Sequence, residues 1–199
     1  MRAWILAGLF GIGLTACGDS QNAAPTPAPA SAPVAAVVPS PSPESSSPAA
    51  EAKPGSKWDY QQDEDKMRGA TTYRAVLASD NFINQSFPYE GDVHLNLYLR
   101  KRADGDKDVI LHIEKGQMPC FSSSEGCSFK AKFDNGPIQT FRAVGTSGAH
   151  DDAIFLDGNM KKFMSSLRKA KEVTIEVNLY ETGRKQFTFT PGGLDWKWF

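Results

Sequence analysis

Residues 92–115 read DVHLNLYLRKRADGDKDVILHIEK, in which two runs of alternating apolar and polar residues flank the turn sequence RADGD. A period of two is typical of β-strands, because successive side chains point to opposite faces of a sheet. Matching the two apolar faces fixes the register, since a slip of one residue would turn every side chain over. The segment therefore predicts a hairpin that pairs Leu99 with Val109, Leu97 with Leu111, Leu95 with Ile113, Arg100 with Asp108 and His94 with Glu114.

The same alternation recurs along the chain from residue 57 onward. It predicts further strands at residues 73–78, 127–134, 139–144, 153–156, 172–180 and 185–190, and residues 194–198 could add a last strand. The expected fold is mainly β: an antiparallel β-sandwich-like domain over residues 57–199, with one short amphipathic helix.

The helix is expected between the strands at 153–156 and 172–180. Met160, Phe163, Met164 and Leu167 stand at positions i, i+3, i+4 and i+7 and form a single apolar stripe. Asp157 or Asn159 can cap its start, and Arg168, Lys169 and Lys171 suit the negative end of its dipole. At this spacing, the two methionines are interpreted as core residues and not as ligands of a soft metal.

Residues 1–17 have the three parts of an export signal. Arg2 is followed by an apolar run over residues 3–13 and by Leu14-Thr15-Ala16-Cys17. The apolar run is shorter than the roughly 20 residues that cross a bilayer but suits a signal peptide. The last four residues resemble the lipobox of bacterial lipoproteins, which implies a signal peptide over residues 1–16, cleavage before Cys17 and lipid on that cysteine. The alternative is an ordinary secreted protein with a chance cysteine at this place.

Residues 17–56 are expected to form a disordered tether after the lipidated cysteine. Nine of the thirteen prolines of the chain fall between Pro25 and Pro54. Proline fixes φ and removes a hydrogen-bond donor, so the segment favours polyproline II or solvated coil. Gly18, and not Asp, follows Cys17, and by the sorting rule of enteric lipoproteins this favours the outer membrane over the inner one. The domain would face the periplasm or the cell surface.

Cys120 and Cys127 enclose a loop of six residues. In an exported protein such a pair most often forms a disulfide. A redox centre usually has the tighter Cys-x-x-Cys spacing. We therefore predict a structural Cys120–Cys127 bridge.

Residues 109–194 resemble, in the order of their features, the invasion-associated locus B family of exported bacterial proteins. The shared parts are a strand at 109–113, Pro119-Cys120 and Gly126-Cys127 around a loop, a helix at 163–167, a strand hairpin at 173–189 and the closing Gly193-Leu194. The long, loop-rich segment 134–155 departs from the family pattern. The resemblance implies a β-sandwich-like envelope domain and brings no catalytic residue with it.

The charge of the domain is balanced. Two of the 22 Lys and Arg and three of the 23 Asp and Glu precede Lys57, which leaves twenty of each from that residue onward. Nucleic-acid binders usually carry a basic excess that neutralises phosphates, so we expect no nucleic-acid partner. The basic clusters at residues 100–102 and 161–171 are interpreted as solvated faces, and the alternative is contact with an anionic lipid or an acidic partner.

The three histidines are the candidates for chemistry. His94 and His112 lie on the same predicted sheet face with Glu114, a combination that could bind a metal, although strand histidines of this kind are usually surface residues. His150 follows a glycine-rich loop, without a nucleophile that the sequence places beside it. We predict no catalytic residue, no metal and no cofactor.

Apolar residues on the polar face of the hairpin and at the end of the chain are the candidates for partner binding. Tyr98 and Ile110 should be cross-strand neighbours, and Trp196 and Trp198 lie near the terminus. If exposed, they would form an interaction patch; if covered, they are core, which the sequence favours. The predicted function is an envelope-anchored lipoprotein that binds, inhibits or protects against another envelope or incoming protein. The alternative is an envelope hydrolase with an unrecognised active site.

Overall fold

The computed structural model describes residues 55–120, 127–146 and 151–199. The predicted hairpin is present, and its register is confirmed pair by pair, from Leu95 with Ile113 to Arg100 with Asp108. The elements of the domain follow in chain order: β1 (Asp59–Asp65), β2 (Ala70–Ala78), β3 (Ile83–Gln85), β4 (Gly91–Val93), β5 (Leu95–Lys101), β6 (Lys107–Ile113), β7 (Cys127–Phe133), β8 (Gln139–Gly145), β9 (Ala153–Leu156), α1 (Met160–Lys169), β10 (Val173–Leu179) and β11 (Gly183–Phe189).

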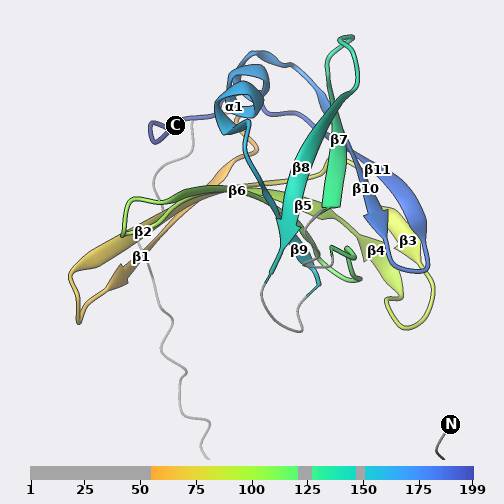
Figure 1. Ribbon diagram of the computed structural model, residues 1–199, viewed down its shortest axis with the longest axis horizontal. Coiled ribbons are helices and arrows are strands. Elements are labelled where there is room, and N and C mark those ends of the chain that lie inside the picture. The colour runs from red at the N-terminus through yellow and green to blue at the C-terminus, as the bar shows by residue number, and fades with distance from the viewer. Residues whose placement is uncertain (1–54, 121–126, 147–150) are drawn as a thin grey trace, which may run out of the picture. The chain divides into compact units, whose positions relative to one another are not determined.

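Nine of these strands form one antiparallel sheet in the order β1-β2-β5-β6-β9-β8-β7-β10-β11, and β3 and β4 pair separately. In Figure 1, β1, β2 and β6 run across the view, whereas β7 and β8 stand steeply against them. The sheet is therefore strongly bent, and the inward side chains of its two halves belong to one hydrophobic core. This arrangement confirms the predicted mainly-β, sandwich-like class, with a continuous sheet in place of two separate ones.

The helix α1 packs against the inner face of β7 and β8. Phe163 meets Phe129, Phe133 and Phe141 with ring centroids 5.2 to 6.1 Å apart and near-perpendicular ring planes. Such edge-to-face contacts are favourable for aromatic pairs. The helix is where the apolar stripe predicted it, with Phe163, Met164 and Leu167 buried.

The predicted capping of α1 is wrong in detail. Asn159 occupies the N-cap, but its φ is 50° and its side chain makes no capping hydrogen bond. The carboxylate of Asp157 is engaged by Arg142 instead, at 2.9 Å. Arg168 and Lys169 do lie in the last turn, as expected from the helix dipole.

The chain end is not a strand, which corrects the expectation for residues 194–198. Trp196 points into the core instead, where it is 6% exposed. Trp198 is partly buried and packs against the same core. Arg168 donates hydrogen bonds from Nη2 to the carbonyl oxygens of Trp196 and Phe199, at 2.7 and 3.1 Å. A side chain thus takes the acceptors that a neighbouring strand would otherwise have used.

The Cys120–Cys127 disulfide is present. It joins the segment after β6 to the start of β7, as predicted. Gly145, at the end of β8, lies so close that a Cβ there would come within 2.5 Å of the Cys120 carbonyl oxygen. The bridge and this close approach fix the corner between β6, β7 and β8.

Candidate functional site

A row of outward apolar side chains crosses five neighbouring strands. Val76 on β2 pairs with Tyr98 on β5, Tyr98 with Ile110 on β6, Ile110 with Phe155 on β9, and Phe155 with Val144 on β8. Directly paired residues point to the same face of a sheet. Because neighbouring strands lie about 4.8 Å apart, the row is about 19 Å long. We call Val76, Tyr98, Ile110, Phe155 and Val144 the outer stripe.

The outer stripe lies on the face opposite the core. The neighbours of Tyr98 and Ile110 along their strands, such as Leu97 and Leu111, are 0% and 1% exposed and belong to the core cluster. Ile110 is 9% exposed but does not belong to that cluster, so its cover comes from the outer face. Val144 is 40% exposed, and the described residues leave the other three stripe members partly open to solvent.

Ion pairs border the outer stripe along one side. Arg100 pairs with Asp108 at 2.7 Å and Arg142 with Asp157 at 2.9 Å, and Arg74 pairs with Asp63. The Arg100 guanidinium also lies over the Phe155 ring, 5.5 Å from its centroid. Each of the three arginines has an aspartate partner, so the border is polar without a net charge.

Tyr98 supplies the polar group of the stripe. Its ring meets that of His112 edge-on, with centroids 5.9 Å apart. Burial raises the pKa of the phenol, and the nearby Glu114 carboxylate adds to the rise, so the hydroxyl keeps its proton at neutral pH. Together with Ile110, Ala153 and Phe155 these rings line a shallow hollow of about 210 Å³. The hydroxyl has no hydrogen-bond partner among the described residues, so it can donate to a bound molecule.

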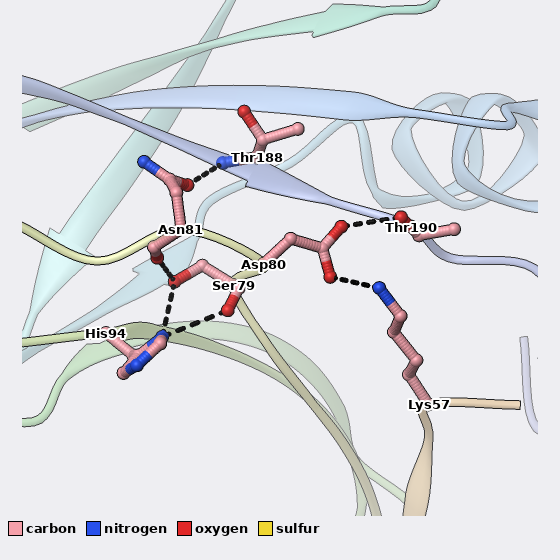
Figure 2. Close-up of polar contacts among 7 residues, drawn as sticks. All are labelled: Lys57, Ser79, Asp80, Asn81, His94, Thr188 and Thr190. Carbon is pink, nitrogen blue, oxygen red and sulfur yellow. Dashed lines mark hydrogen bonds and ion pairs between the residues drawn. The ribbon is translucent and has the colours of Figure 1, made fainter.

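His94 is not arranged as a catalytic base, although it contacts a serine (Figure 2). Its Nδ1 lies 3.0 Å from the Ser79 carbonyl oxygen, and since a carbonyl can only accept, Nδ1 carries the proton. The Ser79 hydroxyl donates to the Asn81 carbonyl oxygen at 2.6 Å. Neither group is therefore set to pass the serine proton to the imidazole, which a nucleophile and its base require.

The surroundings of this Ser79–His94 contact show a structural role. The Asn81 side chain accepts from the Thr188 backbone N–H at 2.7 Å, and Asp80 bridges Lys57 Nζ at 2.6 Å and Thr190 Oγ1 at 2.5 Å (Figure 2). These bonds tie the turn after β2 to β11 and to the segment just after it. The cluster thus holds three parts of the chain together, the turn after β2, the segment before β1 and the end of β11.

The two histidines that the sequence suggested as possible metal ligands have different neighbours. His94 contacts Phe82, and His112 contacts Tyr98. His112 Nε2 lies 3.4 Å from an Asp152 carboxylate oxygen. Within the described ranges, no group of three or more His, Cys, Asp or Glu is placed to hold a metal ion. His150 and Cys17 lie outside the described residues.

The structure separates the two predicted partner-binding pairs. Tyr98 and Ile110 lie at the centre of the outer stripe, whereas Trp196 is a core residue and Trp198 is half-buried against Tyr73. Sequence reasoning missed Val76, Phe155 and Val144 as members of the stripe. Their outward apolar positions were a signal, but the pairing of β6 with β9 and of β9 with β8 was needed to align them.

Comparisons with known proteins add little to the geometry. No family model matches the chain, and no curated protein matches it. A search of solved structures finds invasion associated protein B from Bartonella henselae, with a TM-score of 0.40 and 11% identity over 73% of this chain and 89% of that one. The resemblance noted in the sequence thus reappears as a loose one, and we transfer neither family membership nor function from it.

The described part of the chain contains no helix that is both long and apolar enough to cross a membrane.

Proposed function

We propose that this chain is an envelope lipoprotein whose domain binds another protein through the outer stripe. The observation that carries the proposal is the alignment of five apolar side chains on a sheet face that the described residues leave partly open to solvent. Protein interfaces combine an apolar, aromatic-rich centre with a polar rim, and the stripe with its ion-paired border has that composition. Inhibition of an incoming enzyme, or protection against one, is compatible with a binding surface of this kind.

The border favours a protein partner over a polyanion. Arg74, Arg100 and Arg142 each face an aspartate, so no excess positive charge borders the stripe. Binding to phosphates or anionic lipid headgroups gains its strength from cationic groups that neutralise them. A partner with an apolar patch and a neutral hydrogen-bonding rim fits the stripe better, and the Tyr98 hydroxyl offers it a donor.

The proposed location rests on the sequence of the N-terminus. Leu14-Thr15-Ala16-Cys17 supports lipidation of Cys17, and the proline-rich segment after it supports a tether that presents the domain away from the lipid surface. Mass spectrometry of the membrane fraction should find acyl chains on Cys17. A mature protein that begins at another residue and carries no lipid would contradict this part of the proposal.

Photo-crosslinking in intact cells tests the binding surface. A photoreactive amino acid is placed at position 98, in the stripe, and in a second strain at position 178, an exposed residue of β10. We expect a discrete protein adduct at position 98 and none at 178. No adduct at 98, or the same adducts at both positions, would contradict the proposal.

A further inference from the structure

Another hollow lies between one side of α1 and the start of β6, with Phe199 in its wall. Its volume is about 510 Å³, within the range of about 300–1,000 Å³ that is typical of small-molecule sites. Figure 1 shows the end of the chain beside α1, to which Arg168 ties it. We call this hollow the helix groove. Its lining residues are Lys107, Met160, Lys161, Met164, Ser165, Arg168, Lys169 and Phe199.

The helix groove belongs to the inner side of the sheet, opposite the outer stripe. Lys107 stands two residues before Val109, which is a core residue, so their side chains point to the same face. On α1, Met160, Met164 and Arg168 are spaced four residues apart, which places them along one side of the helix. The groove thus forms where this side of α1 faces the turn end of the β5–β6 hairpin.

The floor of the groove is apolar. Met164 is 1% exposed and belongs to the core, and Met160 and Phe199 are partly buried against it. A methionine side chain is flexible and polarisable, so it adapts to ligands of different shapes. The floor therefore suits an alkyl chain, which needs no hydrogen-bond partner and follows the shape of the surface beneath it.

The rim of the groove carries positive charge. Its charged residues are all cations, and no described Asp or Glu lines it: Lys107, Lys161, Arg168 and Lys169. Arg168 is occupied by the carbonyl oxygens of Trp196 and Phe199. The three lysines form no ion pair with a carboxylate of the described residues, and the Lys107 ammonium lies 5.9 Å from the centre of the Phe199 ring. The rim can therefore accept an anion.

Two of these lysines stand where a cation is unfavourable. Lys107 lies directly opposite Lys101 in the β5–β6 pair, and like charges in that arrangement destabilise a sheet. Lys161 lies in the first turn of α1, at the positive end of the helix dipole, and that turn contains no acidic residue. An anion bound in the groove would reduce both costs.

We propose that the helix groove binds a fatty acid, with the alkyl chain on Met160 and Met164 and the carboxylate among the rim lysines. The chain gains by leaving water, and the carboxylate gains from cations that the described residues leave without a carboxylate partner. The proposal is independent of the outer stripe, which lies on the other face of the sheet, so failure of either leaves the other standing.

Two other occupants fit the groove less well. A peptide helix is about 10–12 Å across, whereas a volume of 510 Å³ corresponds to a cube with an edge of about 8 Å, so an acidic amphipathic helix is too wide. A flat bilayer surface would meet the rim lysines but would leave the recessed floor at Met164 uncovered.

The test is a calorimetric titration of the full-length chain, produced without acylation, with dodecanoate at neutral pH. We expect saturable binding with a dissociation constant on the order of 0.1 mM or tighter. Octanoate has a shorter chain and should bind at least about tenfold more weakly, since each buried methylene adds to the hydrophobic gain. Dodecyltrimethylammonium, which has the same chain length and the opposite charge, should not bind saturably.

A pair of neighbouring lysines provides the matched variants. Lys161→Glu should weaken dodecanoate binding by at least about fivefold, because it replaces an attraction at the rim with a repulsion. Lys162→Glu is the control, since Lys162 is exposed in the same turn of α1 but does not line the groove. It should stay within about twofold of wild type, because salt screens a charge directed away from the groove. Both residues are exposed and outside the core, and equal thermal midpoints will confirm that both variants fold.

Absence of saturable dodecanoate binding to the wild-type chain would overturn the proposal. Equal weakening by Lys161→Glu and Lys162→Glu would show attraction to the overall charge and not to the groove, and would overturn it too. So would binding of dodecyltrimethylammonium with the affinity of dodecanoate. Cosedimentation with vesicles of anionic phospholipid that Lys161→Glu abolishes, without dodecanoate binding, would assign this face to a membrane surface instead.

Discussion

Tyr98 and Ile110 lie directly opposite each other on β5 and β6, and both point away from the core that their strand neighbours build. Ile110 is nevertheless only 9% exposed, because Tyr98 and Phe155 flank it on the outer face. The pair is thus the centre of an apolar row that one strand alone would not reveal. Its position between an ion-paired border and a histidine makes it the main candidate for the surface that meets a partner.

Tyr98 should ionise at higher pH than an ordinary tyrosine, whose pKa is 10.0, because burial disfavours the phenolate. Since its pKa is raised in the folded state, its stabilising contribution is complete below pH 10 and is lost as the pH rises through the raised value. An ultraviolet difference titration of wild type against Tyr98→Phe isolates this group. A transition at or below pH 10 would show that the ring is more solvated than the structure indicates.

Gly145→Ala should destabilise the fold. The added Cβ would lie 2.5 Å from the Cys120 carbonyl oxygen and 3.3 Å from its Cβ, and backbone atoms held beside a disulfide cannot easily give way. Overpacking of this kind typically costs about 1–3 kcal/mol, to be measured by urea unfolding. Gly192→Ala is the control, because a Cβ there meets nothing within 4 Å. Similar midpoints for the two variants would contradict the predicted crowding.

The Cys120–Cys127 bridge should stabilise the domain without being needed for its fold. Its sequence separation is seven residues, and the chain-entropy model gives about 2–3 kcal/mol for so short a loop. Replacing both cysteines with serine should lower the free energy of unfolding by that amount and leave the far-ultraviolet circular dichroism of a β protein intact. A reductant should then have no effect on the variant. Complete unfolding of the variant would contradict this prediction, because it would mean that the hydrophobic core cannot stabilise the fold without the disulfide.

Most of the fold could be predicted because the alternation of β5, β6, β10 and β11 is strong and local. The strand β1 could not be predicted. Tyr60 is the one apolar side chain in DYQQDED, and a single core residue produces no alternation of apolar and polar residues. The end of the chain was predicted wrongly for the opposite reason, because an alternating pattern is present there but no strand forms. Its alternating tryptophans fit a strand, but Arg168 and the core decide their positions, and both act from far away in sequence.

The candidate site could be predicted only at its centre. The hairpin register alone brings Tyr98 beside Ile110, because a short turn and two matched apolar faces fix it. Phe155 and Val144 join through β9, a strand of four residues that pairs with β6 and β8, both of which precede it in the chain. Such pairings depend on how distant segments pack together, which a local period does not encode.

The most direct test of the central claim is the yield of the adduct photo-crosslinked at position 98, compared between Val144→Glu and Thr140→Glu. Both residues are exposed on the outer face of β8, and they lie about 13 Å apart along the strand. A carboxylate at position 144 would be buried without a partner when the stripe is covered, which is costly, whereas one at position 140 would stay solvated. We predict that Val144→Glu lowers the yield by at least about tenfold and that Thr140→Glu leaves it at the wild-type level, with unchanged thermal midpoints for both. Equal yields from the two variants would contradict binding through the outer stripe.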